Sequence, residues 1–564
     1  MKYIAILLLY LILALFPINA ISQNTIQGFI FDASTKKPLS YATVYLKKSK
    51  KGSLTNIEGA FNLYCDNSSD TLIIRYLGYQ ERRIYINTTN ALTIFLKQKP
   101  FELSEVKIIN ENQIYLAKII HRSIIQQSKI LNSTECKSFA KLLTIQNDTL
   151  IRESFEAFYT THLNSHGVIK NHFKNGILKQ NITTKDPFST FDLFSNYSPN
   201  LNIFYHKKPS NNKRIVVLNK ANTKAKTIES PISSYYINSI TKRYYLSSRM
   251  IAKNIIRISY QNRTDNNEHG VIIINLKKYL FVELSLKKYY KKNLPFYSSN
   301  PLYTVDSLNI GFDIHFDNAT LNNYPKLILI NLDFNYIHQQ SHKIQHISTK
   351  SQQLIYNYNK AFDKPLPKHL NILNDYDLLS FVPIRKVLWT KESSILKTSY
   401  EKSINEGRFS RNSITSSYEV WTNDWIFSWD KAKKLKSPSK DSIENVEPST
   451  FIYLDYYLNN DKYEVICQAI FDYSNTYSPD SNRLPEIAMK IEKYFYYISE
   501  IATKLENELN NSDNLTERQI KQAYRKSMHS VKKERKIFMK TQKAYIKQWI
   551  DENNKNIKKE LEKI

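Results

Sequence analysis

The chain from Ile26 to Leu96 alternates apolar and polar residues with a period of two, which is typical of strands that turn one face toward a core. Turn sequences rich in Gly, Asn, Ser and Lys separate the runs. About seven short strands at this spacing predict a β-sandwich over residues 23–108. The apolar positions are Ile26, Gly28, Ile30, Ala42, Val44, Leu46, Phe61, Leu63, Leu72, Ile74, Tyr76, Ile84, Ile86, Leu92, Ile94 and Leu96.

Residues 109–382 combine one helical segment with a long series of strands. Apolar residues at helical spacing between 111 and 132 predict an amphipathic helix that covers a sheet. No helix-length segment separates the strands that follow, so we expect an antiparallel sheet. The predicted strands are 141–145, 154–161, 255–260, 271–275, 279–287, 310–317, 327–336 and 344–356.

The C-terminal part is interpreted as a connector over 383–450, followed by a helical region over 451–564. Two apolar stripes with heptad-like spacing predict an antiparallel helical hairpin, with partner binding through the stripes as the alternative. Asn514 and Glu517 form a candidate capping box for the second helix. The stripes are Ile487, Ile491, Tyr494, Ile498, Ile501 and Leu505, then Tyr524, Val531, Phe538 and Tyr545.

Residues 1–22 have the layout of a secretory signal peptide. A basic start, Met1-Lys2, precedes an apolar run over 4–16, then Pro17 and the small residue Ala20. The run is shorter than the ~20 apolar residues of a membrane span, and an uncleaved anchor is the alternative. We expect an exported protein in the periplasm or at the cell surface, where association with the outer membrane is a further option.

Composition narrows the functional classes. Of 564 residues, 42% are hydrophobic and 23% charged, which is typical of globular proteins, and only 9 are Gly, which disfavours glycine-rich phosphate-binding motifs. The net charge of +29 predicts attraction to anionic surfaces, and export argues against nucleic acid as the partner. Residues 515–564 hold 15 Lys+Arg against 6 Asp+Glu, so a basic C-terminal helix could meet an anionic membrane. The lysines expected to face solvent are Lys532, Lys533, Lys536, Lys540, Lys543 and Lys547.

A series of residues recurs in order along the N-terminal segment: Ile26-Gln-Gly28, Asp32, Pro38-Leu39, Ala42, Val44, Leu46, Gly52, Thr55-Asn56, Gly59, Phe61, Tyr76-Leu-Gly-Tyr79 and Leu103-Ser-Glu-Val106. In this series the segment resembles the carboxypeptidase regulatory-like domain over about residues 24–108. The resemblance implies a transthyretin-like sandwich and an envelope location, but no catalysis, since in the family this domain is an accessory to a peptidase. The middle region resembles, in its order of elements, the middle domains of other exported proteins with the same N-terminal module, some of which look like the curved sheets of lipoprotein carriers.

Histidine and cysteine offer little catalytic chemistry. No His is followed three residues later by Glu, so the zinc motif of a metallocarboxypeptidase is missing. His338, His342 and His346 could bind zinc or copper, but no carboxylate adjoins them, and a polar hairpin is the preferred interpretation. The pair His162 and His166 has Leu163 where a zinc peptidase needs Glu. The three cysteines have no metal-binding spacing and allow at most one disulfide: Cys65, Cys136 and Cys467.

Packing on half-buried strand faces is the preferred interpretation of the aromatic residues that lie among lysines, with a groove for a glycan or peptide as the alternative. Altogether we expect a multidomain α+β protein that is not an enzyme, has no catalytic, metal or cofactor residues, and binds envelope proteins or a glycan or peptide ligand. The alternative is a hydrolase of peptide or glycan with an unrecognised site in the middle domain. The aromatic residues are Tyr235, Tyr236, Tyr244, Tyr245, Phe281, Tyr289, Tyr290, Phe296, Tyr297, Trp421, Trp425 and Trp429.

Overall fold

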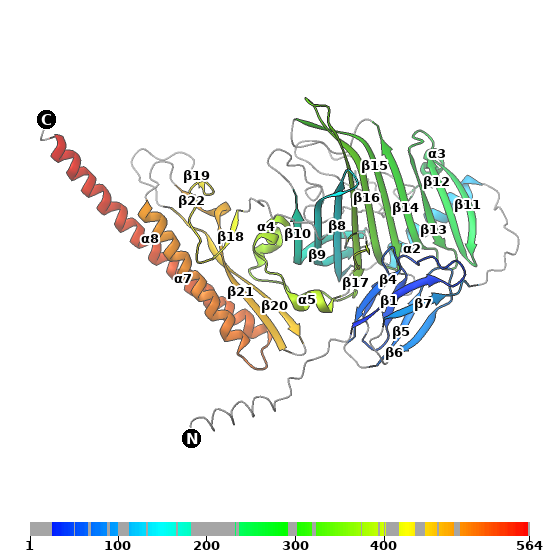
Figure 1. Ribbon diagram of the computed structural model, residues 1–564, viewed down its shortest axis with the longest axis horizontal. Helices are drawn as coiled ribbons and strands as arrows, with labels where there is room; N and C mark the ends of the chain where they lie inside the picture. Colours follow the sequence, from blue (N-terminus) through cyan, green and yellow to red (C-terminus); the bar gives the residue numbers. More distant parts are fainter. Residues whose placement is uncertain are drawn as a thin grey trace, which may run out of the picture. The chain divides into compact units, whose positions relative to one another are not determined.

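The computed structural model divides the chain into two compact units (Figure 1). The first comprises Met1–Glu102 with Leu388–Glu406, and the second Leu103–Val387 with Gly407–Ile564. The structure describes residues 25–561 except for gaps at 50, 66–68, 87–90, 100–111, 131–132, 165–166, 182–231, 233–235, 292–301, 318–322, 374, 393–394, 400, 402–416, 435–445, 460–461 and 479–484. The predicted signal peptide therefore lies outside the described residues.

The first unit contains the predicted sandwich, which is confirmed. Two sheets, ordered β4-β1-β7 and β3-β2-β5-β6, enclose a core of alternating Ile, Leu and Val side chains. β1 pairs antiparallel with β4 and parallel with β7. The strands are β1 (Thr25–Asp32), β2 (Thr43–Leu46), β3 (Gly52–Leu54), β4 (Ala60–Tyr64), β5 (Asp70–Arg75), β6 (Arg82–Ile86) and β7 (Leu92–Leu96).

Asp32, at the end of β1, holds the turns of the sandwich together. Its carboxylate accepts hydrogen bonds from the Ser34 amide (2.7 Å), the Tyr79 hydroxyl (2.5 Å) and the Gln98 amide (2.8 Å). These donors favour the charged form and lower the pKa of Asp32 below its ordinary value. The nearby turn needs Gly59, because its φ of +76° lies in a region that side chains disfavour.

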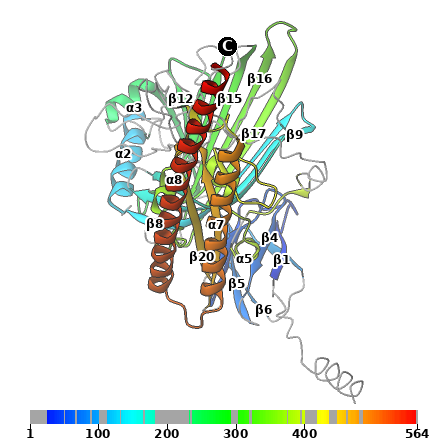
Figure 2. The same cartoon turned by 90° about the vertical axis from the view of Figure 1, so that its left-hand side faces the viewer.

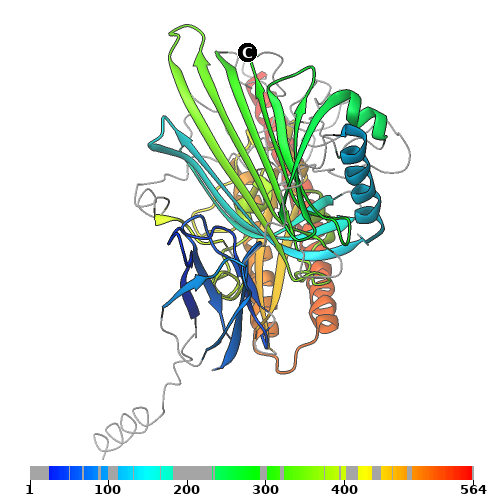
Figure 3. The same cartoon turned by 90° about the vertical axis from the view of Figure 1, so that its right-hand side faces the viewer.

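The second unit is built on one antiparallel sheet of ten strands, ordered β10-β9-β8-β17-β16-β15-β14-β13-β12-β11. Figure 3 shows these long strands and the curve of the sheet. Each predicted middle-region strand overlaps one of them, with residues 279 and 317 just outside the observed strands, whereas β10 and β11 were not predicted. The strands are β8 (Thr134–Gln146), β9 (Leu150–Asn164), β10 (Gly167–Gln180), β11 (Tyr244–Ala252), β12 (Ile255–Asn262), β13 (Glu268–Asn275), β14 (Leu280–Tyr290), β15 (Tyr303–Phe316), β16 (Pro325–His338) and β17 (Ile344–Tyr356).

Helices lie against the flanks of the sheet. α2 (Gln113–Ile130), which the sequence predicted over 111–132, contacts β11, β14 and the short helix α3 (Ile237–Arg243). At the other end, α4 (Asp375–Phe381) contacts β10. None of the described helices combines the length and apolar character that a membrane crossing requires.

The C-terminal part of this unit differs from the expected connector and helical region. Residues 388–406, including most of α5 (Lys386–Lys391), group with the sandwich, where the Ser399 amide donates to Glu58 (2.9 Å). The range predicted as helical begins with a hairpin of strands, β20 (Thr450–Asn459) and β21 (Lys462–Asp472), which pairs with β18 (Tyr418–Val420). β20 is buried on both faces, so it lacks the alternation that would have identified it. Short elements complete the region: η3 (Lys368–Ile372), β19 (Lys433–Lys434), η4 (Tyr473–Asn475) and β22 (Tyr477–Ser478).

The predicted helical hairpin is present as α7 (Pro485–Asn510) and α8 (Glu517–Leu561), which lie side by side in Figures 1 and 2. The capping box is shifted from its predicted place. At the start of α8, the Thr516 amide donates to the Gln519 side-chain oxygen (2.9 Å), and the Gln519 amide donates to the Thr516 hydroxyl (3.4 Å). Asn514 has a φ of +54° and belongs to the preceding turn.

A buried ionic cluster joins the β20–β21 layer to the edge of the ten-stranded sheet. The carboxylate of Asp455 on β20 contacts the Lys174 ammonium of β10 at 2.5 Å and the Arg385 guanidinium at 3.0 Å. The three side chains are at most 4% exposed. Burial is the main influence on Lys174 and lowers its pKa, which the charge of Asp455 opposes. One carboxylate thus compensates two buried cations.

We therefore predict that Asp455→Asn destabilises the protein strongly, because it leaves two buried cations without an anion. The expected loss in the free energy of unfolding is about 3–5 kcal/mol, as for other broken buried pairs. Chemical denaturation followed by Trp fluorescence measures it. Glu135→Gln is the control, since Glu135 is 36% exposed and its removal from an ion pair with Lys364 should cost under about 1 kcal/mol. Equal losses in the two variants would contradict the assigned role of the cluster.

Candidate functional site

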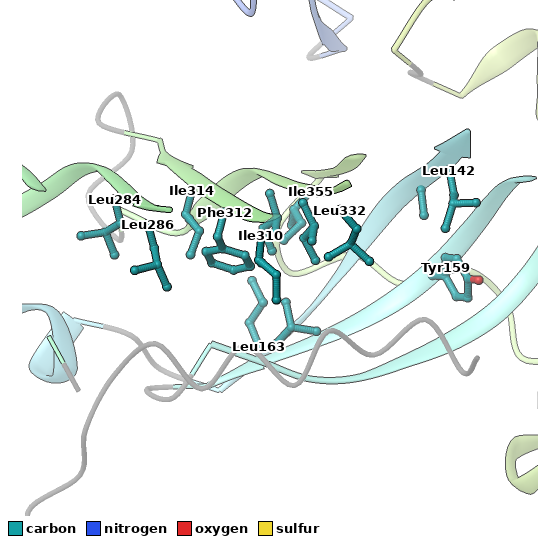
Figure 4. Packing of buried hydrophobic residues seen from close by; sticks show 14 of the residues in the cluster. Leu142, Tyr159, Leu163, Leu284, Leu286, Ile310, Phe312, Ile314, Leu332 and Ile355 are labelled. Atoms are coloured by element: carbon teal, nitrogen blue, oxygen red, sulfur yellow. The ribbon is translucent and has the colours of Figure 1, made fainter. Parts of the chain in front are cut away.

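The main feature of the second unit is the apolar inner face of the ten-stranded sheet. Pairing of Phe312 with Ile330 and of Ile310 with Leu332 sets these side chains on one side of the sheet. Figure 4 shows side chains of the central strands and of β8 and β9 directed toward one another across the curve of the sheet. We define the inner face by the labelled residues, all buried: Leu142, Tyr159, Leu163, Leu284, Leu286, Ile310, Phe312, Ile314, Leu332 and Ile355.

A buried polar cluster interrupts this surface on β8, β9, β10 and β17. The Ser138 and Thr161 hydroxyls lie 2.6 Å apart, and Thr161 donates to the Asn171 side chain at 2.6 Å. The Gln353 amide nitrogen donates to both Ser138 and Asn171 at 3.1 Å. The carbonyl oxygen of the same Gln353 side chain is buried with no hydrogen-bond partner among the described residues. This oxygen could accept a hydrogen bond from a bound molecule.

A buried carboxyl group stands beside the cluster. Asp375, at the start of α4, is 3% exposed and accepts a hydrogen bond of 2.8 Å from the Tyr159 hydroxyl. Burial raises the pKa of Asp375 to about 7, and the Tyr159 hydrogen bond opposes the shift without cancelling it. Asp375 can therefore exchange a proton near neutral pH.

The opposite end of the inner face carries a second polar group, which has a structural role. Glu268 is fully buried and accepts hydrogen bonds from Tyr244 (3.1 Å), Asn262 (3.2 Å) and Lys288 (2.7 Å). Each of its neighbours comes from β11, β12 or β14, so the group fastens the last strands of the sheet together. Its lone pairs are engaged, which distinguishes it from the cluster around Gln353.

The three histidines singled out in the sequence lie on one β-hairpin. His338 ends β16, His342 occupies the turn with a φ of +51°, and His346 lies in β17, so the hairpin interpretation is confirmed. Among the described residues, no group of three His, Cys, Asp or Glu could hold a metal ion. His166 lies outside the described residues, whereas His162 sits 3.2 Å from Glu135.

The tryptophans of the candidate aromatic groove pack against core residues. Trp425 is 8% exposed, and its ring centroid lies 4.7 Å from that of Phe495 on α7 and 5.0 Å from that of Phe471 on β21. Trp421 packs on Phe495 as well. Tyr244 and Phe281 are fully buried, and Tyr235, Phe296 and Tyr297 lie outside the described residues. The three cysteines are buried, and none of them forms a disulfide among the described residues.

Sequence reasoning missed the polar cluster and Asp375. The cluster joins three consecutive strands to β17, whose Gln353 is 182 residues beyond Asn171, and each residue alone is an ordinary strand residue. The one available signal was the run of Thr349, Ser351 and Gln353, where polar residues replace apolar ones on the inward positions of β17. Such a break in an alternating pattern marks a polar patch inside a core.

Comparison with known proteins supports the sandwich alone. The family model for the CarboxypepD_reg-like domain matches residues 26–108, so this segment is a carboxypeptidase regulatory-like domain. The domain is of a regulatory, non-catalytic type. No curated protein matches the chain. One solved structure, the MucA/MucB complex of Pseudomonas aeruginosa, aligns with 42% of this chain and 92% of its own at 7% identity and a TM-score of 0.12.

The buried carboxyl group predicts a specific pH dependence of stability. Because folding raises the pKa of Asp375 from 3.8 to about 7, the folded state binds more protons than the unfolded state between those values. The contribution of Asp375 therefore destabilises the fold progressively as pH rises from about 4 to above 7. Asp375→Asn should remove this contribution while retaining the partner for Tyr159. Denaturant unfolding of both proteins from pH 4 to 8 measures the difference.

The expected result is a free-energy difference that grows in favour of Asp375→Asn toward pH 8. Subtraction of the two curves removes the titration of other groups. A difference that is constant over this range would contradict a raised pKa at Asp375.

Proposed function

We propose that this protein is a non-catalytic, exported binding protein of the cell envelope whose inner sheet face holds an acyl chain of a lipid or lipoprotein. The observation that carries the proposal is the extent of the apolar inner face. Its residues come from β8, β9 and the four strands β14–β17, and all of them are buried. Flexible aliphatic side chains around Phe312 suit a long hydrocarbon chain, because apolar burial is non-directional.

The polar cluster supports an amphiphilic ligand. A fatty acid, lipid or acylated peptide presents hydroxyl or amide groups beside its apolar chain. The unpartnered Gln353 oxygen is a hydrogen-bond acceptor within the apolar surface, and the adjacent hydroxyls of Ser138 and Thr161 can donate or accept. A few placed polar groups in an apolar surface are typical of sites that bind small molecules.

The remaining parts of the chain fit a role in the envelope. The carboxypeptidase regulatory-like domain is of a non-catalytic type, and domains of this kind serve as accessories. The signal-peptide layout of residues 1–22 supports export to the periplasm or surface. A partner that delivers or receives the ligand, such as another envelope protein, would complete the proposed role.

A hydrolase of peptide or glycan remains the second candidate, because Asp375 has the pKa of a general acid or base near neutral pH. The two functions differ in the role of Asp375. A binding protein with Asp375→Asn should retain its ligand affinity at neutral pH. A hydrolase with the same substitution should retain binding but lose turnover.

The test combines ligand identification with a blocked variant. Mass spectrometry of organic extracts from the purified protein should find an acyl lipid, and the delipidated protein should bind the fluorescent fatty acid cis-parinaric acid. Leu332→Trp, which fills space at the inner face, should weaken that binding by roughly tenfold. Asn331 precedes Leu332 in β16, and its side chain is directed to the outer face. Asn331→Trp is therefore the matched control and should leave binding of the probe unchanged.

Thermal melts of both variants establish that each is folded. If folded wild-type protein yields no lipid and binds no probe, the inner face is a structural core only and the proposal is wrong. Equal weakening by the two substitutions would likewise place the probe elsewhere.

A further inference from the structure

The helix α8 exposes a row of cationic side chains that the hairpin does not use. One face of the helix packs into the core through Ile520, Tyr524, Val531 and Phe538, all buried. Hydrogen bonds from Tyr524 to the Ile452 carbonyl (3.0 Å) and from Gln542 to the Val446 carbonyl (3.2 Å) fix its orientation. On the side of the helix opposite this stripe, the exposed basic residues are Arg525, Lys526, His529, Lys532, Lys533, Lys536, Lys540, Lys543 and Lys547. Arg535 is exposed as well but lies outside this row.

These nine residues share one side of the helix. At about 100° per residue, their positions fall within an arc of roughly 120°, centred opposite the buried stripe. The row runs over residues 525–547, a length of about 33 Å at 1.5 Å per residue. We call it the cationic face of α8.

The cationic face contains no compensating charge. Glu534 is the one acidic residue between 525 and 547, and the same helical geometry turns it roughly 140° from the centre of the arc. The ion pair of Lys521 with Glu517 lies before the face begins. Lysines at positions 532, 536 and 540 follow one another at i,i+4, where like charges repel and destabilise a helix. Helix stability therefore does not explain this arrangement, whereas binding to an anionic surface does.

We propose that the cationic face of α8 binds the surface of an anionic bilayer, with the helix lying parallel to the headgroups. A straight row of charges on a packed, rigid helix fits a flat surface and needs no ordering on binding. Seven of its eight permanent cations are Lys, a compact charge suited to diffuse attraction rather than to bidentate recognition. The arc contains no aromatic ring on which a base could stack, which disfavours single-stranded nucleic acid.

This inference concerns a surface separate from the inner face and goes beyond the proposed function. It holds whether or not an acyl chain binds the sheet. It would, however, place a lipid-binding protein beside its source of lipid.

The test is co-sedimentation of the full-length protein with vesicles. Vesicles of phosphatidylcholine with phosphatidylglycerol should bind the protein at low salt, and pure phosphatidylcholine vesicles should not. Binding should fall steeply as salt shortens the Debye length toward about 8–10 Å. A variant with Lys532, Lys536, Lys540 and Lys543 each changed to Gln should bind anionic vesicles on the order of a hundred- to a thousandfold more weakly at low salt.

The matched control changes four exposed lysines elsewhere in the same unit to Gln and so alters the net charge equally: Lys242, Lys253, Lys277 and Lys278. This variant should keep most of the binding. Equal losses in the two variants would show that net charge, not the cationic face, governs association and would overturn the proposal. So would equal binding to neutral vesicles, or displacement from anionic vesicles by an equal charge concentration of duplex DNA.

Discussion

The ten-stranded sheet imposes one requirement on the second unit, namely that its apolar inner face be kept from water. Alternation with a period of two sends every second residue of each strand to that face, and ten paired strands join these rows into one surface. Because the sheet is curved, side chains of β8 and β9 are directed toward side chains of the central strands. Helices α2 and α4 complete the flanks, where they contact β11, β14 and β10. The position of each polar side chain on the inner face follows from the same pairing register.

Polar groups inside this apolar surface fall into two kinds. Around Glu268, every neighbour is engaged, and the group stabilises the pairing of the last strands. Around Gln353, an acceptor is left over, and Asp375 adds a carboxyl group that titrates near neutral pH. A satisfied network serves the fold, whereas an unsatisfied buried acceptor costs free energy that a hydrogen bond from a ligand would offset. We therefore place the proposed ligand near the β8–β10 end of the sheet.

The C-terminal layer shows how charge can serve two purposes in one protein. In the cluster of Lys174, Arg385 and Asp455, burial makes every contact specific, and the three side chains join β10 to β20. On α8, cations remain in water, where each interaction is weak and screened, so only a row of them can produce useful binding. The first arrangement fixes structure, and the second suits association that salt can reverse.

Local patterns in the sequence determined most of the elements. Alternation predicted the sandwich and the antiparallel strands, and the stripes through Ile491 and Phe538 predicted the hairpin, because side-chain period reflects backbone geometry directly. Only the tertiary structure decided what meets across the chain. Lys174 and Asp455 are 281 residues apart, β20 is apolar on both faces and so has no strand period, and the Ser138–Gln353 cluster spans four strands. Contacts of this kind depend on strand order and pairing register. These are set only when distant segments of the chain pair, and the local period of the side chains does not encode them.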